Sequence, residues 1–363
     1  MARLKEYNGH YCESEYEYAF IGFLEAEGWK YSSGNNIRRV TKRDVLIVDD
    51  FKKFMVDTNP DLTEEEVTQI FDNVRLVGAE SDFATLHKVY GWMVNGVQFT
   101  PQNELPGMIP LIDFENWDKN IFRVVNQFTV EYTNNGQKEN RRPDVLLFVN
   151  GMPLCVVELK NPADANATIY DAWEQINIRY WRDIPHLLHY CPLACISDGV
   201  KTRLGTVRTP YEHFYSWRRV NEGDAVSTLP FAETETMIKG VYSPERFLEI
   251  FRDYIYFQDS IYDSDEQEIV CRYPQFFATR LLKQSIIKSV VEKSGKGGTY
   301  FGATGCGKTY TMAFLARQLA LRCTDIPEIG SPTIILIVDR DELQKQGSKL
   351  FTKLSFIGRF LDR

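Results

Sequence analysis

The sequence predicts an α/β protein that begins with a mixed sheet flanked by helices and continues into the start of a parallel sheet. The runs 145–149 and 154–157 are apolar on both faces and are joined by Asn150-Gly151, which is typical of a hairpin between central strands. Further along, the glycine-rich segment 302–309 follows a strand-like run and precedes a helical one, as at the start of a parallel α/β unit. At 363 residues the chain exceeds one ordinary core, so two domains are expected.

The composition is that of a soluble globular protein, with 44% hydrophobic, 25% charged and 13% aromatic residues. No apolar run approaches ~18 residues, so no membrane-spanning segment is expected. The N-terminus lacks the apolar core of a secretory signal, and we expect a cytoplasmic protein. The seven cysteines form no C-x-x-C pair and the five histidines are scattered, so we expect reduced thiols and no zinc site.

Charge is unevenly distributed along the chain. The formal net charge of −8 is by itself poor support for nucleic-acid binding. Residues 141–220, however, contain ten Lys and Arg against eight Asp and Glu. A local basic surface is therefore compatible with the acidic total.

Hydrophobic periodicity and capping signals place the other elements. Helices are expected at 14–29, 63–74, 171–184 and 243–257, strands at 120–132 and 193–197, and loops at 100–110 and 133–143. In the first helix, the apolar stripe that contains Phe20 also contains Glu17. Thr63 should cap the second helix, and Pro244 should open the last one after Ser243 as its cap.

The segment GATGCGKT at 302–309 fits the pattern G-x-x-x-x-G-K-[ST], with a strand expected at 298–302 and a helix after it. Backbone N–H groups of such a loop wrap an anion, and the helix N-terminus adds a positive dipole. Lys308 would reach the β- and γ-phosphates of ATP, and Thr309 would ligate Mg²⁺. A chance glycine-rich turn is the alternative. The residues predicted to bind ATP are Gly302, Thr304, Gly305, Cys306, Gly307, Lys308 and Thr309.

A second strand is expected at 333–338, followed by a helix, which would continue a parallel sheet. Between this strand and residue 363 the sequence offers no second acidic motif and no arginine finger, which ATP hydrolysis needs. We therefore expect that the chain binds ATP, does not hydrolyse it efficiently, and is a fragment of a longer motor protein.

Charged residues border the two central apolar runs. A three-residue hairpin loop would place Asp144 directly opposite Glu158, whereas a two-residue loop would turn Asp144 to the other face unless a bulge intervenes. Glu158 and Lys160 share a face in either case. Asp144, Glu158 and the carbonyl of Leu159 would offer oxygen ligands to Mg²⁺, and Lys160 would stabilise charge on a phosphate. A structural ion-pair cluster at the sheet edge is the alternative.

The chain resembles the N-terminal part of the restriction (R) subunit of type I restriction-modification enzymes. The segments VVNQFTV, RRPDVLLFVNGMPLCVVELKNP, RDIPHLLHY, SDG, RYPQFFA, GATGCGKTYTM and VDRDELQKQ occur in the family's order, and 30–118 matches only loosely. The resemblance implies a PD-(D/E)xK endonuclease domain at 1–235 and a linking helix at 236–265. It further implies that 266–363 is the truncated start of the first RecA-like lobe of a superfamily-2 translocase.

The resemblance also implies roles for individual residues. Asp144 and Glu158 would be the metal-binding carboxylates of the nuclease, and Lys160 its catalytic lysine. Arg272 and Gln275 would form the motif that reads adenine ahead of a helicase P-loop, with a capped loop residue as the alternative. Mg²⁺ would serve both the nuclease site and the bound ATP.

Two further features of the family are less regular in this sequence. Glu17 would be the acidic residue of the first nuclease helix, although Glu13 or Glu15 could fill that place. The Q-x-x-x-Y motif is shifted, because Gln175 precedes Tyr180 by five residues instead of four. Either the helix has a local irregularity there, or Gln175 is a surface residue outside the site.

Asp339 and Gln346 fall in a motif that contacts the DNA backbone in such motors, with a helix cap and a solvated face as the alternative. The implied partners are double-stranded DNA and the methyltransferase (M) and specificity (S) subunits, in a bacterial or archaeal cytoplasm. The implied activity is that of a type I site-specific, ATP-dependent deoxyribonuclease, with weak or no cleavage by this chain alone. A non-catalytic ATP-binding module and a helicase-nuclease of DNA repair are the competing interpretations.

Overall fold

The computed structural model describes residues 13–78, 80–102, 105–161, 168–226, 232–258 and 266–337. The chain divides into two compact units, Met1–Arg252 and Asp253–Arg363. This boundary cuts through the segment that was expected to link two domains at 236–265, and its residues up to Arg252 are part of the first unit.

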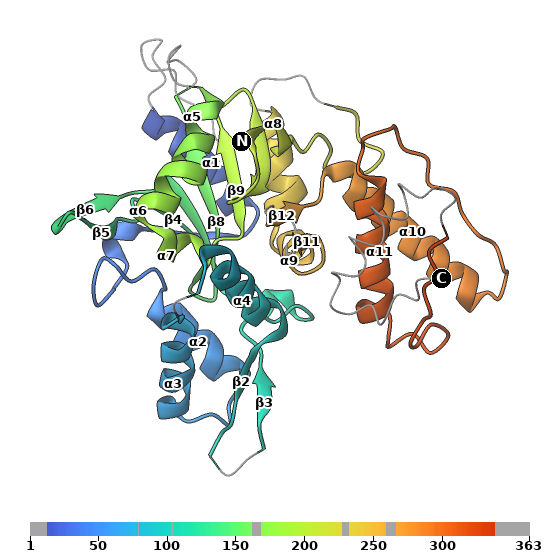
Figure 1. Ribbon diagram of the computed structural model, residues 1–363, viewed down its shortest axis with the longest axis horizontal. Helices are drawn as coiled ribbons and strands as arrows, with labels where there is room; N and C mark the ends of the chain where they lie inside the picture. The colour runs from blue at the N-terminus through green and yellow to red at the C-terminus, as the bar shows by residue number, and fades with distance from the viewer. Residues whose placement is uncertain are drawn as a thin grey trace. The chain divides into compact units, whose positions relative to one another are not determined.

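A mixed six-stranded sheet forms the core of the first unit (Figure 1). The order of its strands is β1 (Lys30–Ser33), β4 (Phe122–Asn126), β7 (Val145–Val149), β8 (Met152–Leu159), β9 (Leu193–Ser197) and β10 (Thr202–Thr206). The β1–β4 and β8–β9 pairs are parallel, and the other pairs are antiparallel. Every residue of β7, β8 and β9 is buried, which confirms that the apolar runs at the hairpin are central strands.

Helices cover both faces of this sheet. On one face α1 (Glu13–Ala26) contacts β1, β4 and β8, and on the other α5 (Ile169–Glu174) contacts β8 and β9. The helix expected at 171–184 is formed by α5, a π-helical turn (Gln175–Tyr180) and α6 (Trp181–Asp183). Further along the chain are α7 (Pro185–Leu188), α8 (Ala232–Met237), a second π-helical turn (Ile238–Tyr242) and α9 (Pro244–Asp253). Within the described ranges, no helix is long and apolar enough to cross a membrane.

A helical lobe is inserted between β1 and β4. Its elements are α2 (Val48–Thr58), α3 (Glu64–Arg75), α4 (Asp82–Asn95), β2 (Val97–Phe99) and β3 (Gly107–Ile109). Thr63 caps α3 as predicted, in a capping box with Glu66. The proline-rich loop expected at 100–110 is only partly correct, because its last residues form β3 and pair with β2. Short 3₁₀ turns lie at Gly34–Asn36, Trp117–Lys119 and Tyr211–His213.

The strand expected at 120–132 is divided into β4 and β5 (Val130–Asn134), and Gln127 between them has a positive φ of 55°. The loop expected at 133–143 is wrong, because β6 (Gln137–Arg141) pairs with β5 in a hairpin. Asn135 and Gly136 at its turn both have positive φ. This is the same Asn-Gly signal as at 150–151, but it joins polar strands that lack the apolar alternation of a buried hairpin.

The helix expected at 243–257 ends at Asp253, and the apolar run after it forms strand β11 (Ile255–Gln258), whose first three residues are buried. In the second unit, β11 pairs with β12 (Gln267–Val270), and α10 (Tyr273–Val291) packs against α11 (Lys308–Arg322).

The parallel sheet that the sequence predicts in the second unit is not formed by its described residues. The strands expected at 298–302 and 333–338 are absent over 298–302 and 333–337. Phe301, Ile335 and Ile337 are 93%, 77% and 88% exposed. A strand is stable only beside a hydrogen-bonding neighbour, and the described part of this unit supplies none for these runs. Asp339 and Gln346, expected to contact DNA, lie outside the described residues.

Candidate active site

The hairpin between β7 and β8 sets the position of the two carboxylates. Its loop has two residues, Asn150 and Gly151, which both have the positive φ of a type I′ turn. A β-bulge then shifts the register, so that Leu147 pairs with Cys155 while Phe148 pairs with Pro153. The bulge adds one residue to β8, which is the condition under which a two-residue loop leaves both carboxylates on one face.

Asp144 and Glu158 consequently lie side by side. The last pair of the ladder is Val145 with Val157, and these two acids follow it on their respective strands. The backbone N–H of Asp144 donates to Oε1 of Glu158 at 3.4 Å, and the N–H of Leu159 donates to Oδ2 of Asp144 at 2.7 Å. The side chain of Glu158 is fully buried at this end of the sheet.

A closed ring of side chains connects Glu158 to Lys160 through the π-helical turn. Tyr180 donates its hydroxyl to Oε1 of Glu158 at 2.5 Å, and Nε2 of Gln175 donates to that hydroxyl at 2.8 Å. Nζ of Lys160 donates to Oε1 of Gln175 at 2.9 Å and lies 4.0 Å from Oε2 of Glu158. A π-turn closes i→i+5, so it places residues five apart one above the other. Of the two alternatives that the shifted spacing left open, the structure shows the helical irregularity, with Gln175 inside the cluster.

Glu17 reaches the same end of the sheet from α1. Asn126, the last residue of β4, donates from Nδ2 to Oε1 of Glu17 at 2.5 Å and accepts from the hydroxyl of Tyr31 at 3.0 Å. Burial raises the pKa of Glu17, Asn126 opposes this, and the charge of Asp144 raises the pKa further. Asn126 and Tyr31 were not predicted from the sequence, where the only signal for them is a polar residue, Asn126, that ends an apolar strand.

The electrostatics of the cluster favour a cation. Burial, and then the neighbouring Asp144, raise the pKa of Glu158 well above its usual range. Burial also raises the pKa of Asp144, against the opposing effects of the Leu159 N–H group and of Lys160. Oε2 of Glu158 is buried without a hydrogen-bond partner, since Lys160 at 4.0 Å is too distant for one. Two adjacent carboxylates with an unsatisfied buried oxygen suit a divalent metal ion.

The residues present fit such an ion only with help from other oxygen atoms. No group of three or more His, Cys, Asp and Glu side chains is arranged to hold a metal, as far as the described residues extend. A cation at Asp144 and Glu158 would therefore take its remaining ligands from the Leu159 carbonyl, from water and from a bound phosphate.

The second unit contains the glycine-rich loop at the start of α11. Gly305 and Gly307 have φ of 79° and 81°, which glycine adopts without strain. Nζ of Lys308 donates to the carbonyls of Gly302 and Ala303 at 2.8 and 3.0 Å and so folds back over the loop. Thr309 lies in the first turn of α11.

Gln275 contacts this loop from the first turn of α10. Its Nε2 donates to the carbonyl of Gly307 at 3.1 Å, and its Oε1 accepts from the backbone N–H of Arg272 at 2.8 Å. Arg272 is the residue that precedes α10, and its charge lowers the pKa of Tyr310 against the larger effect of burial. The structure therefore places Arg272 and Gln275 beside the loop that the sequence predicts to bind ATP.

Comparison with known proteins follows the same division. A family model described as the type I restriction enzyme R protein N terminus matches residues 11–213, more than half of the chain. A model described as SWI2/SNF2 ATPase matches residues 274–359.

Individual relatives agree with these matches. The type I restriction enzyme HindI endonuclease subunit of Haemophilus influenzae is 29% identical over 94% of this chain and 32% of its own length. A relative from Methanocaldococcus jannaschii, whose name also describes a type I restriction enzyme endonuclease subunit, is 29% identical over 93% of this chain and 34% of its own length. The chain thus spans about a third of the length of these curated relatives. By the match over residues 11–213, the chain belongs to the family of type I restriction enzyme R protein N-terminal regions.

Proposed function

We propose that the first unit hydrolyses phosphodiester bonds of double-stranded DNA in a metal-dependent reaction. The observation that carries this proposal is the pairing of Asp144 with Glu158, whose buried Oε2 has no hydrogen-bond partner and lies 4.0 Å from Lys160. A merely structural ion pair would satisfy its buried oxygen atoms, because an unsatisfied buried acceptor costs stability. A functional site tolerates that cost when a ligand later removes it.

The residues of the cluster divide into ligands and positioning groups. Asp144, Glu158 and the Leu159 carbonyl would hold the ion, and Glu17 would add negative charge from α1. When bound, a divalent cation such as Mg²⁺ supplies charge that polarises a phosphodiester and acidifies water.

Lys160 presents its ammonium group beside Glu158, where it stabilises negative charge that develops on the phosphate. Gln175 holds the ammonium group in place, and Tyr180 fixes the orientation of the Glu158 carboxylate. Both are positioning residues, since they act through Lys160 and Glu158.

For the second unit we infer ATP binding at the loop from Gly302 to Thr309, and the SWI2/SNF2 ATPase match over residues 274–359 supports this inference. Backbone N–H groups would surround the phosphates, Lys308 would release its two carbonyl partners to reach them, and Thr309 would ligate Mg²⁺. Gln275 and Arg272 would read the adenine from α10.

The relatives' names describe type I restriction endonuclease subunits. On that ground we infer that this chain supplies the DNA-cleaving and ATP-binding parts of a restriction complex, together with methyltransferase (M) and specificity (S) subunits. Because the chain spans about a third of those relatives, ATP-driven translocation is an inference for the complex and not for this chain alone.

A calorimetric Mn²⁺ titration of the wild type, Asp144→Ala and Glu158→Ala, without nucleotide, tests the nuclease proposal. We expect the wild type to bind and both variants to lose binding, since the two carboxylates form one site. Equal behaviour of all three proteins would mean that the carboxylates are structural and would favour a non-catalytic ATP-binding module. Mg²⁺-dependent nicking of plasmid DNA, absent in both variants, would separate cleavage from ion binding alone.

A further inference from the structure

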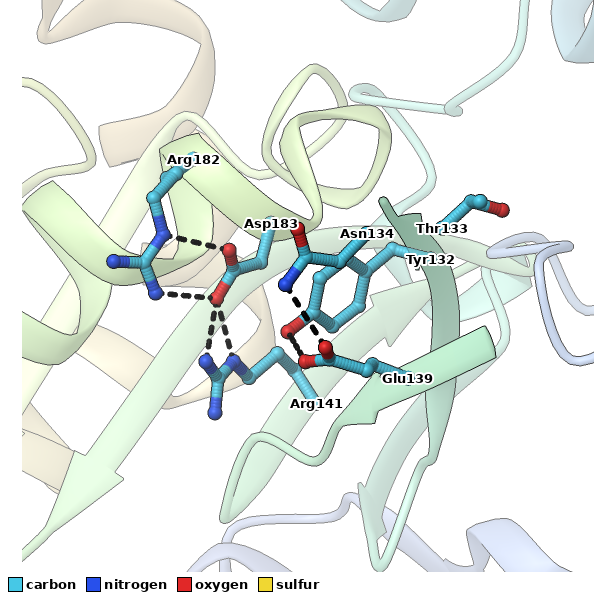
Figure 2. A pocket seen from close by; sticks show the side chains of 7 residues that line it. All are labelled: Tyr132, Thr133, Asn134, Glu139, Arg141, Arg182 and Asp183. Atoms are coloured by element: carbon cyan, nitrogen blue, oxygen red, sulfur yellow. Dashed lines mark hydrogen bonds and ion pairs between the residues drawn. The ribbon is translucent and has the colours of Figure 1, made fainter. Parts of the chain in front are cut away.

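A cavity of about 400 Å³ lies between the β5–β6 hairpin and α6 in the first unit (Figure 2). One wall is the face of the hairpin that carries Tyr132, Glu139 and Arg141, which the strand register places together. The other wall is α6. The lining residues are Tyr132, Thr133, Asn134, Glu139, Arg141, Arg182 and Asp183.

Two arginines are held on a single carboxylate within this cavity. Nε of Arg141 donates to Oδ2 of Asp183 at 2.7 Å, and Arg182 donates from Nε and Nη2 to Oδ1 and Oδ2 at 2.7 and 2.9 Å. The side chain of Asp183 is only 6% exposed, whereas those of Arg141 and Arg182 are 35% and 64% exposed. A buried acid thus fixes two guanidinium groups, and together the three groups carry a net charge of +1.

Fixed guanidinium groups of this kind suit a phosphate. Each has five N–H donors in a planar fork, and the bonds to Asp183 use one edge of it. The two free oxygens of a phosphodiester can accept hydrogen bonds from the N–H groups of a guanidinium fork. The immobilisation of both side chains by Asp183 also reduces the entropy that would be lost on binding.

The cavity adjoins the carboxylate site through the chain on both of its walls. Arg141 precedes Asp144 by three residues, so that their Cα atoms are at most ~10 Å apart even in an extended chain. Arg182 follows Tyr180 by two residues. A span of ~10 Å corresponds to about one to three nucleotide steps along a DNA strand.

We propose that this cavity binds a backbone phosphodiester of the DNA strand whose scissile bond lies at Asp144 and Glu158. Arg182 and Arg141 contact that phosphate and hold the strand one to three nucleotides from the cleaved bond. This phosphate-binding site rests on the proposed nuclease function. It identifies the path that the DNA strand takes on leaving the carboxylates Asp144 and Glu158.

Glu139 also lines the cavity, and its negative charge disfavours the binding of an anion there. This effect provides a second test. Glu139 faces the cavity and accepts hydrogen bonds from the Tyr132 hydroxyl at 2.5 Å and from Nδ2 of Asn134 at 2.9 Å. Its charge repels a phosphate at Arg182. Removal of that charge by Glu139→Gln should therefore strengthen DNA binding, whereas Arg182→Gln should weaken it.

Binding of a fluorescently labelled duplex of about 20 base pairs is measured by anisotropy with the full chain, in EDTA and at about 50 mM salt, where phosphate contacts dominate affinity. Arg179→Gln is the matched control, because it removes the same charge from the same helical segment. Arg179 pairs with Glu174 at 2.7 Å and does not line the cavity. Thermal melts of all variants check that the hairpin is intact.

We expect Arg182→Gln to weaken DNA binding roughly tenfold and to reduce the slope of log K against log salt by about 0.9. Arg179→Gln should change both quantities little. Equal losses of DNA affinity in the two variants, or no DNA binding by the wild type, would overturn the proposed phosphate-binding site. Mn²⁺ binding by Arg182→Gln should equal that of the wild type. If Asp144→Ala retained Mn²⁺ binding while Arg182→Gln lost DNA affinity, the nuclease proposal would fail and the cavity would remain a DNA-binding site.

Discussion

Nε2 of Gln175 donates a hydrogen bond to the hydroxyl of Tyr180 at 2.8 Å, although the two residues are five apart on a helix. The π-helical turn between them makes this contact possible. Gln175 joins two groups of the candidate site, because its carbonyl oxygen accepts from Lys160 while its amide donates to Tyr180.

Gln175→Ala should therefore destabilise the first unit by about 1 kcal/mol, since Lys160 and Tyr180 each lose a partner. The affinity for Mn²⁺ should stay within about threefold of the wild type, because Gln175 supplies no ligand. Urea denaturation and calorimetry measure the two quantities. Gln98→Ala, at an exposed position of β2, is the control and should change neither. Loss of Mn²⁺ binding in Gln175→Ala would mean that the glutamine is itself a ligand.

The position of Gln175 shows where sequence reasoning reaches its limit. The spacing to Tyr180 could be read directly, but the outcome depends on distant contacts. Trp173 and Asn177 donate to the carbonyl of Thr209, and Trp181 donates to that of Val207. These bonds attach the helix to a segment some thirty residues away, which no local pattern reveals.

The hairpin site was more predictable, because its cause is local. Asn150-Gly151 and the apolar runs predict the turn and the buried strands, and a two-residue loop needs a bulge if Asp144 and Glu158 are to share a face. The place of that bulge, between the Leu147 and Phe148 pairs, follows from how the strands pack and could not be derived. In the second unit, the strands expected at 298–302 and 333–338 needed neighbouring strands that the described residues do not supply.

Glu158→Gln should stabilise the metal-free protein while it abolishes metal binding. The carboxylate is fully buried, and its Oε2 has no hydrogen-bond partner, so an uncharged isostere removes a desolvation cost. The remaining oxygen can still accept from Tyr180. We expect a gain of about 1–3 kcal/mol in the free energy of unfolding without metal, measured by urea denaturation in EDTA.

Asp183→Asn is the comparison for that experiment. Asp183 is also buried, but it is paired with two arginines, which hold its pKa below the usual range. Its neutralisation should destabilise the protein by about 1–3 kcal/mol. If Glu158→Gln destabilised the protein as much as Asp183→Asn does, Glu158 would be a structural residue.

His186 should make the first unit less stable in mild acid. Burial, and then the charges of Arg43 and His189, lower its pKa from 6.5 to about 4, and Asp44 opposes them. A histidine whose pKa is lower in the folded than in the unfolded state favours folding in its neutral form. Its contribution is therefore complete above about pH 6.5 and decreases as the pH falls toward 4. After a discount for partial exposure, we expect a loss of about 2 kcal/mol over this range.

The measurement is urea denaturation of the wild type and of His186→Phe at intervals from pH 7 to pH 4. The difference between the two curves isolates the histidine, because carboxylates that titrate in this window are common to both proteins. His213→Gln, at an exposed histidine, should follow the wild type. A His186→Phe variant with the full acid sensitivity of the wild type would exclude this histidine as its source.

Gly307 and Gly305 form a matched pair for testing the contact between Gln275 and the glycine-rich loop. Both have positive φ, so alanine at either position costs about 1 kcal/mol in backbone strain. A Cβ at Gly305 would have open space, whereas one at Gly307 would lie 2.3 Å from Nε2 of Gln275. Gly307→Ala should therefore displace Gln275 and weaken binding of a fluorescent ATP analogue much more than Gly305→Ala does.

The double variant Gly307→Ala/Gln275→Ala distinguishes a steric clash from simple strain. If the clash is the cause, truncation of Gln275 removes the obstacle, and the double variant should recover about 1 kcal/mol of the stability lost in Gly307→Ala. Nucleotide affinity should recover less, because the adenine contact proposed for Gln275 is lost with its side chain. Equal effects of Gly305→Ala and Gly307→Ala on both quantities would show that Gln275 does not press on the loop. Full recovery of affinity in the double variant would instead remove Gln275 from the nucleotide site and leave the loop itself as the binding element.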